Sequence, residues 1–140
     1  MRYLTNKDFA SLITPEELQI ISRDEEGWAQ AETTAIELAA GYLRGRYDAE
    51  AAFSRQGAER NPMLVHVVMV LSIWQCLHRL PERMGYDRWE SLHADAMRYL
   101  EDIRRGHTNP DLPLPAEAES DPAGTGAVRF GGYKRSTYDY

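Results

Sequence analysis

The chain has 140 residues, a hydrophobic fraction of 43%, a charged fraction of 27% and a formal net charge of −6. This length suits one domain, and the composition is that of a globular protein with a modest core. The acidic balance argues against a body that grips nucleic acid, because phosphate affinity comes from clustered Lys and Arg. A single cysteine, Cys76, excludes an internal disulfide framework and a zinc site built on a cysteine pair.

The first residues contain two helix-start signals, and no apolar stretch of the kind a signal peptide needs. Thr5 with Asp8 three residues later is a capping-box pattern, which predicts a short first helix. Thr14, followed by Pro15 and Glu17, is a stronger signal of the same kind and predicts a second helix.

A longer helix is expected over residues 25–44, because its apolar residues recur at spacings of three and four. These residues are Trp28, Ala31, Ala35, Leu38, Ala39 and Tyr42. Small residues at 39–41 would let a neighbouring helix approach closely. Residues 45–61 form a predicted loop anchored by Tyr47 and Phe53, and a loop of this length usually holds short helical pieces or has a function.

Asn61 and Pro62 predict the start of a helix over residues 63–80 that is apolar on nearly every side. Such a helix belongs at the centre of a bundle or at a subunit interface. Its β-branched residues would also suit a strand, but its length and its cap favour a helix. Polar residues interrupt the longest apolar run, 63–77, which is also shorter than the ~20 residues of a membrane span. We therefore expect no membrane helix.

Asp87, with Glu90 three residues later, is expected to cap the last helix. Two arginines and Gly106 are a typical helix ending, since cations favour the negative end of the dipole and glycine ends the helix. The body therefore reads as helices throughout.

No set of reactive residues converges in this pattern. His66 and His78 are twelve positions apart on one predicted helix, about 18 Å along its axis, so they cannot share a metal. Cys76 and His78 point in different directions. Neighbouring carboxylates such as Glu16 and Glu17 lie at helix ends, where they complement the dipole. The sequence predicts no enzyme, no cofactor and no metal site.

The composition changes at His107. Four of the seven prolines and four glycines lie between this residue and Tyr140. Such a segment cannot bury enough apolar surface to offset its ordering entropy, so we expect an extended tail that orders against a partner. The predicted organisation is a helical body over residues 1–106 and an interaction tail over residues 107–140, with residues 110–122 as a stiff spacer.

The end of the tail, residues 128–140, combines three cations and four aromatic residues with one acid. Arginine and aromatic residues are common anchors of protein interfaces, and short alternating pieces can add to the edge of a partner's sheet. Basic residues interleaved with aromatics also stack on single-stranded bases, so a soluble nucleic-acid-binding or regulatory module is the alternative. The predicted protein-binding residues are Val128, Arg129, Phe130, Tyr133, Lys134, Arg135, Tyr138 and Tyr140.

Four segments of the body carry a resemblance to a known family. They are Tyr3-Leu4-Thr5 with Asp8-Phe9, residues 39–47 (AAGYLRGRY), Asn61-Pro62 before the apolar helix, and residues 86–106. Over residues 1–106 the chain resembles a Mu-like family of small helical proteins of tailed bacteriophages, related in fold to head–tail connector adaptors. The expected fold class is all-α, a compact bundle of about five helices with a long extended C-terminal tail.

The resemblance implies a structural virion protein, made in the host cytoplasm and located in the neck at the head–tail interface. Copies would form a homo-oligomeric ring, commonly a dodecamer, below the portal and would extend the DNA channel. The implied partners are the portal protein, neighbouring subunits, and a head-completion (stopper) or tail-side neck protein. DNA would pass through without specific binding, and the family supplies no catalytic residues to carry over.

Overall fold

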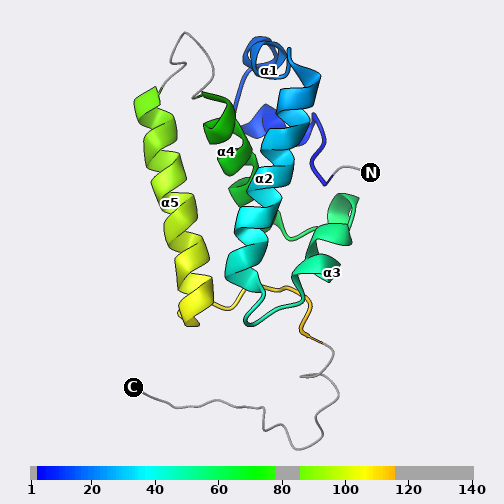
Figure 1. Ribbon diagram of the computed structural model, residues 1–140, viewed down its shortest axis with the longest axis vertical. Coiled ribbons are helices and arrows are strands. Elements are labelled where there is room, and N and C mark those ends of the chain that lie inside the picture. The colour runs from blue at the N-terminus through cyan, green and yellow to red at the C-terminus, as the bar shows by residue number, and fades with distance from the viewer. Residues whose placement is uncertain (1–2, 78–85, 116–140) are drawn as a thin grey trace, which may run out of the picture.

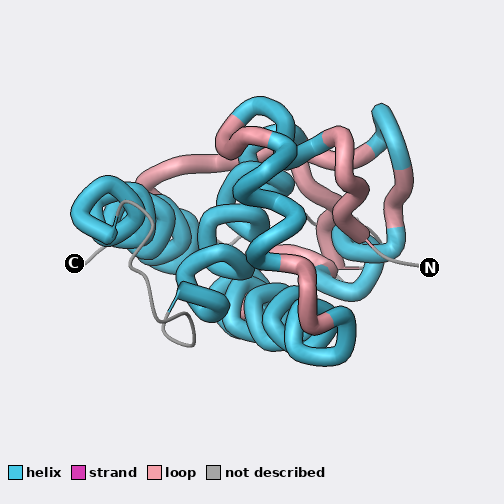
Figure 2. The backbone as a smooth tube through the Cα atoms, turned by 90° about the horizontal axis from the view of Figure 1, so that it is seen from above, coloured by secondary structure: helices cyan, strands magenta, loops and turns pink. Residues whose placement is uncertain are grey.

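The computed structural model of the chain describes residues 3–77 and 86–115, and this part is all-α (Figure 1). Its main body is three helices: α2 (Glu25–Leu43), α4 (Pro62–Leu77) and α5 (Tyr86–Arg105). α2 and α5 run in the same direction, while α4 runs antiparallel to them and contacts both. Seen from above, the described residues form helices and loops without a strand (Figure 2). The predicted helical bundle is confirmed.

Two predicted capping patterns precede the first two elements, and only the second caps its helix. Thr14 and Glu17 form a complete capping box before α1 (Pro15–Ile21), with N···O distances of 3.1 and 3.0 Å. Asp8 accepts a hydrogen bond from the Thr5 amide at 2.7 Å, but it is itself the first helical residue and Lys7 precedes it, so the prediction that Thr5 is the cap is wrong. The element that follows is a 3-10 helix, η1 (Asp8–Ser11), because the cap of α1 comes only three residues after it.

The predicted loop at 45–61 contains two short helical elements, α3 (Ala49–Ser54) and η2 (Gly57–Glu59). Asp48 caps α3 by accepting from the Ala51 amide at 3.1 Å. Both predicted anchors are engaged, since Tyr47 is buried and Phe53 packs on the ring of Tyr3 with centroids 5.1 Å apart.

α4 occupies the centre of the bundle. Eleven of its sixteen residues are buried, which explains why its sequence is apolar on nearly every side. Asn61 caps it by accepting from the Leu64 amide at 3.0 Å, and the buried Ser72 hydroxyl is satisfied by donating to the Val68 carbonyl at 2.8 Å. The side chains of α2 that face α4 are small. Ala35 and Ala39 are fully buried there, so the two helices approach closely, as predicted.

α5 begins at Tyr86, so Asp87 lies in its first turn and the prediction that Asp87 is the cap is wrong. A carboxylate in the first turn still favours the positive end of the helix dipole, which explains why the pattern resembles a cap. The helix ends as predicted at Gly106, which has a left-handed φ of 81°. The amides of Gly106 and His107 donate to the carbonyls of Ile103 and Asp102 at 3.0 and 2.8 Å, which is a Schellman motif.

Residues 107–115 cross from the end of α5, past the end of α2, to the side of α3 (Figure 1). The Leu112 side chain is 9% exposed, and the Asp48 amide donates to the Pro113 carbonyl at 2.9 Å. The Asn61 side-chain amide donates to the Asp111 carbonyl at 3.1 Å. The first residues of the predicted spacer therefore pack on the bundle, because one leucine among the prolines finds a place in the core.

Candidate functional site

The eight protein-binding residues predicted from the sequence lie outside the described residues, and they stay a prediction. They are Val128, Arg129, Phe130, Tyr133, Lys134, Arg135, Tyr138 and Tyr140. The described body offers three other features for comparison: a bonded N-terminal segment with a hollow beside it, the separated histidines, and an apolar strip on the surface.

Residues 3–9, here called the N-terminal latch, are fixed to the body by Arg60. The guanidinium donates to both carboxylate oxygens of Asp8 at 2.7 and 3.0 Å. It also donates to the backbone carbonyls of Tyr3 and Gly57 at 2.8 and 2.9 Å. The Arg60 and Asp8 side chains are only 10% and 14% exposed. The hydrogen bond from Arg60 holds the pKa of Asp8 below its usual range, and the same contact raises the pKa of Arg60.

The latch is also tied to α2. The Leu4 amide donates to the Glu32 carboxylate at 3.0 Å, and the Glu32 side chain is buried. Phe9 is 1% exposed and packs on Trp28 with ring centroids 5.1 Å apart. The first of the four segments that carry the resemblance therefore packs the chain's start onto α2 and the α3–α4 connection.

Tyr3 is the most buried polar side chain of the latch, at 3% exposure. The Arg60 guanidinium lies 5.7 Å from its ring centroid. Its hydroxyl is buried and has no hydrogen-bond partner among the described residues. Burial raises the pKa of Tyr3 to about 12, because the charged phenolate would lose its water.

A hollow of about 350 Å³ lies beside the latch and opens to solvent. Its lining includes Asp8, Ser11, Arg60, His66 and Met69. Asp8 and Arg60 bond to each other, and the Ser11 hydroxyl donates to the Asp8 backbone carbonyl at 3.1 Å. Asp8, Arg60 and Ser11 thus bond to one another's side chains or backbone, and none of these bonds pairs a nucleophile with a base.

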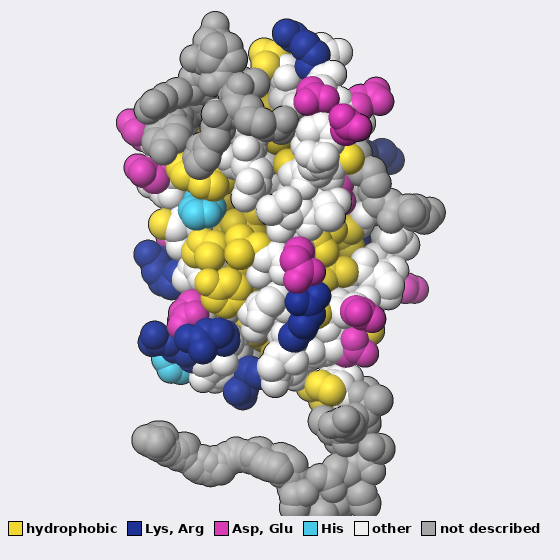
Figure 3. Space-filling model, in the orientation of Figure 1, with side chains coloured by type: hydrophobic (Ala, Val, Ile, Leu, Met, Phe, Trp, Pro, Cys, Tyr) yellow, Lys and Arg dark blue, Asp and Glu magenta, His cyan; other side chains and the backbone are white. Residues whose placement is uncertain are grey.

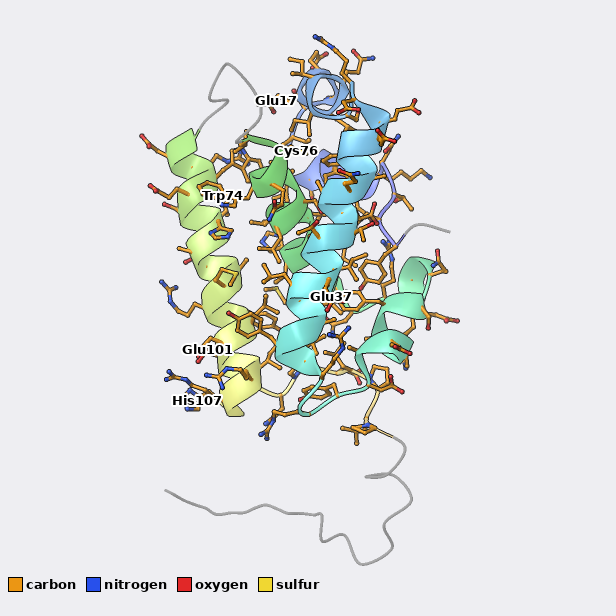
Figure 4. The ribbon with its side chains drawn as sticks, viewed as in Figure 1. Glu17, Glu37, Trp74, Cys76, Glu101 and His107 are labelled. Carbon is orange, nitrogen blue, oxygen red and sulfur yellow. The ribbon has the colours of Figure 1, made fainter. Side chains whose placement is uncertain are left out.

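The histidines that the structure describes lie in separate places. Figure 4 shows His107 just beyond the end of α5, far from Trp74 and Cys76. His66 lines the hollow, His93 stacks on Trp74 with centroids 4.7 Å apart, and His107 lies 3.8 Å from the Asp102 carboxylate. His78 is outside the described residues, and Cys76 is buried in α4. Within residues 3–77 and 86–115, no group of three or more His, Cys, Asp or Glu side chains could hold a metal. No helix in this part is long and apolar enough to span a bilayer.

An apolar strip lies on the surface between α2 and α5, where hydrophobic side chains gather in the middle of the face shown in Figure 3. Tyr42 lies close enough to Arg104 of α5 for their side chains to interact electrostatically, so it lies on the α5 side of α2. Leu38 precedes Tyr42 by one turn and shares that side. Met97 precedes Arg104 by seven residues, two turns, and faces the same way. All three apolar side chains are only partly buried.

The strip continues to Trp74 and His93, because His93 precedes Met97 by one turn and stacks on Trp74. We call this set the α2–α5 strip: Leu38, Tyr42, Trp74, His93 and Met97. Its members come from three helices, so no single stretch of sequence marks it. The 3.6-residue periodicity of α2 and α5 identifies their apolar stripes, but it does not separate core residues from those at the edge of the stripe.

Ion pairs border the strip. Glu37 accepts from Arg44 in two hydrogen bonds at 2.8 and 3.0 Å on the exposed side of α2. On α5, Glu101 accepts from both Arg104 and Arg105, which lowers its pKa to about 2. These exposed pairs keep the surface around the strip soluble and add little to stability.

In comparisons with known proteins, the chain matches no protein-family model, no curated protein and no solved structure. The resemblance to the phage family therefore rests on the four quoted segments alone.

Proposed function

We propose that the chain is a structural subunit of the neck of a tailed bacteriophage, a connector that forms a ring below the portal. The observation that carries this proposal is the use of the latch. Tyr3, Leu4, Asp8 and Phe9 belong to the first of the four segments that carry the resemblance, and their side chains or backbone groups pack and bond the body together. The latch residues stabilise the fold and position no reactive group. A segment with this role suits a structural subunit that is repeated around a ring.

The proposed partners are further copies of this chain, the portal protein and a stopper or tail-side neck protein. In this account the tail docks on the portal or on a neighbouring subunit, and DNA passes through the ring unbound. Three of the four arginines of α5 support the last point, because Arg98, Arg104 and Arg105 are each paired with an acid of the same helix. Cations neutralised in this way contribute little to phosphate binding.

Deletion of residues 117–140 tests the docking role. The shortened chain should keep its helical circular dichroism and its melting temperature, because the described core ends at Leu112. It should be missing from assembled particles, which should then fail to retain DNA. Particles that carry the shortened chain and keep their DNA would show that the tail does not dock it.

A full-length variant with Tyr133→Ala and Tyr138→Ala is the milder companion experiment. It should bind the particles more weakly without lowering the melting temperature of the free chain, because the described core ends at Leu112. A gel-shift assay separates the alternative function. Binding to single-stranded DNA that weakens as salt rises would favour the nucleic-acid-binding module and contradict the connector.

A further inference from the structure

The side chains of the α2–α5 strip pack against the core of this chain on one side and stay partly exposed on the other. The partly buried side chains of Leu38, Tyr42 and Met97 line up across two helices, and the aromatic pair of Trp74 and His93 extends them. Aromatic residues and methionine are enriched in interfaces relative to other surfaces. The strip therefore has the chemistry of an acceptor for aromatic and aliphatic side chains.

The described chain leaves the bundle at the opposite edge. The hydrogen bond from the Asp48 amide to the Pro113 carbonyl holds the chain against the start of α3. The bond from Asn61 to the Asp111 carbonyl fixes it beside the start of α4. Figure 1 shows that this exit lies across α2 from α5. Residues 107–115 thus carry the chain away from its own strip.

Twenty-five residues follow Pro115. Residues 116–127 can span about 40 Å when extended, and residues 128–140 about 43 Å. α2, with 19 residues, is about 28 Å long. A segment that starts at the α3 edge of one subunit can therefore reach a neighbour and cover the whole strip there.

We propose that residues 128–140 of one copy dock on the α2–α5 strip of the next copy, with Phe130 and the tyrosines as anchors. This inference rests on the proposed function, because it names the contact that links subunits around the ring. The contact is heterologous: the α3 edge of one copy, where the tail leaves, faces the α5 edge of the next. Heterologous contacts of this kind close into rings when the rotation between copies permits.

Disulfide trapping between two full-length variants tests the proposal. One variant carries Met97→Cys on the strip, and the other carries Phe130→Cys in the tail. Mixed under mild oxidation, they should form a covalent heterodimer, because each residue comes from a different chain. Glu50→Cys, on the exposed face of α3, replaces Met97→Cys as the matched control and should give little heterodimer. The buried Cys76 is present in every sample, so the unmodified chain reports its background.

A second substitution, in the chain that carries Met97→Cys, tests whether the strip itself binds the tail. Leu38→Glu in the Met97→Cys chain should lower the heterodimer yield about tenfold, since it places a charge where an apolar contact forms. A heterodimer yield equal to that of the Glu50→Cys control would overturn the proposal. The proposal would also be overturned if a chain that carries both cysteines formed an intramolecular disulfide instead of a disulfide between chains.

Electron micrographs of the unmodified chain separate this proposal from the proposed function. Rings without the link between positions 97 and 130 would refute the docking contact and leave the connector function standing. The link without rings would support the contact and refute the ring.

Discussion

At the residue scale, Arg60 joins the start of the chain to its middle. Its partner Asp8 is 52 positions away, and its four hydrogen bonds end on three residues of the latch and of η2. No local pattern predicts this pairing, because sequence spacing identifies neighbours within a helix and not contacts made by folding. The sequence pattern therefore identifies Asp8, but it does not identify Arg60.

Arg60→Met should lower the free energy of unfolding by about 3 kcal/mol, because it leaves the Asp8 carboxylate and the Tyr3 carbonyl partly buried and unpaired. Urea unfolding followed by circular dichroism measures the change. Arg55→Met is the matched control, an exposed arginine nearby whose loss should change stability by less than about 0.5 kcal/mol. Equal effects of the two variants would show that the Arg60 contacts do not hold the latch.

Tyr3 makes the pH dependence of stability testable at the alkaline end. Its pKa is about 12 in the folded chain and 10.0 for a free tyrosine side chain, so its contribution to stability is fully present below pH 10. As pH rises from 10 towards 12, the unfolded chain loses the proton first. The contribution of Tyr3 to the free energy of unfolding, on the order of 2 kcal/mol, is therefore lost over that window.

Tyr3→Phe should remove this part of the alkaline loss. At pH 7 the variant should be as stable as the unmodified chain or slightly more so, because the buried hydroxyl has no partner among the described residues. Urea titrations of both chains at pH 7 and pH 11 give the comparison. A loss of more than about 1 kcal/mol at pH 7 would mean that the hydroxyl makes a stabilising bond.

At the element scale, helix ends were the most predictable feature, because a cap depends on residues within three or four positions. Thr14 and Glu17, Asn61, and Gly106 all act as their spacing predicts. The short helices between residues 45 and 61 were expected without being located. A cap at Asp87 would start the helix at residue 88, two residues later than its start at Tyr86, since an acid favours both the cap and the first turn.

Two glycines give opposite predictions in otherwise similar helical surroundings. Gly106→Ala should cost about 1 to 2 kcal/mol, because its φ is left-handed and a Cβ would come within 2.9 Å of the Arg46 guanidinium. Gly41→Ala should stabilise the chain by up to about 1 kcal/mol, because Gly41 lies inside α2 with nothing within 4 Å of a Cβ. Melting curves of the two variants should shift in opposite directions, and a shift in the same direction would contradict the helix ending described for α5.

At the scale of the whole molecule, the sequence predicts the bundle but not how its surface is used. The apolar pattern of α4 predicts the centre of a bundle or a subunit interface, and the structure places the helix at the centre, with eleven of its sixteen residues buried. The docking of residues 107–115 depends on Leu112, on a backbone hydrogen bond from Asp48 and on a side-chain hydrogen bond from Asn61, which composition does not reveal. The α2–α5 strip needs three helices in place before it exists.

The proposed function requires that copies of this chain form a closed ring. Electron microscopy of the purified full-length chain at high protein concentration, with its mass measured in solution, tests that claim most directly. The account predicts ring-shaped particles, with a mass of about 190 kDa for twelve copies of the 16.0 kDa chain. A chain that remains a monomer at every concentration and forms no rings would contradict it.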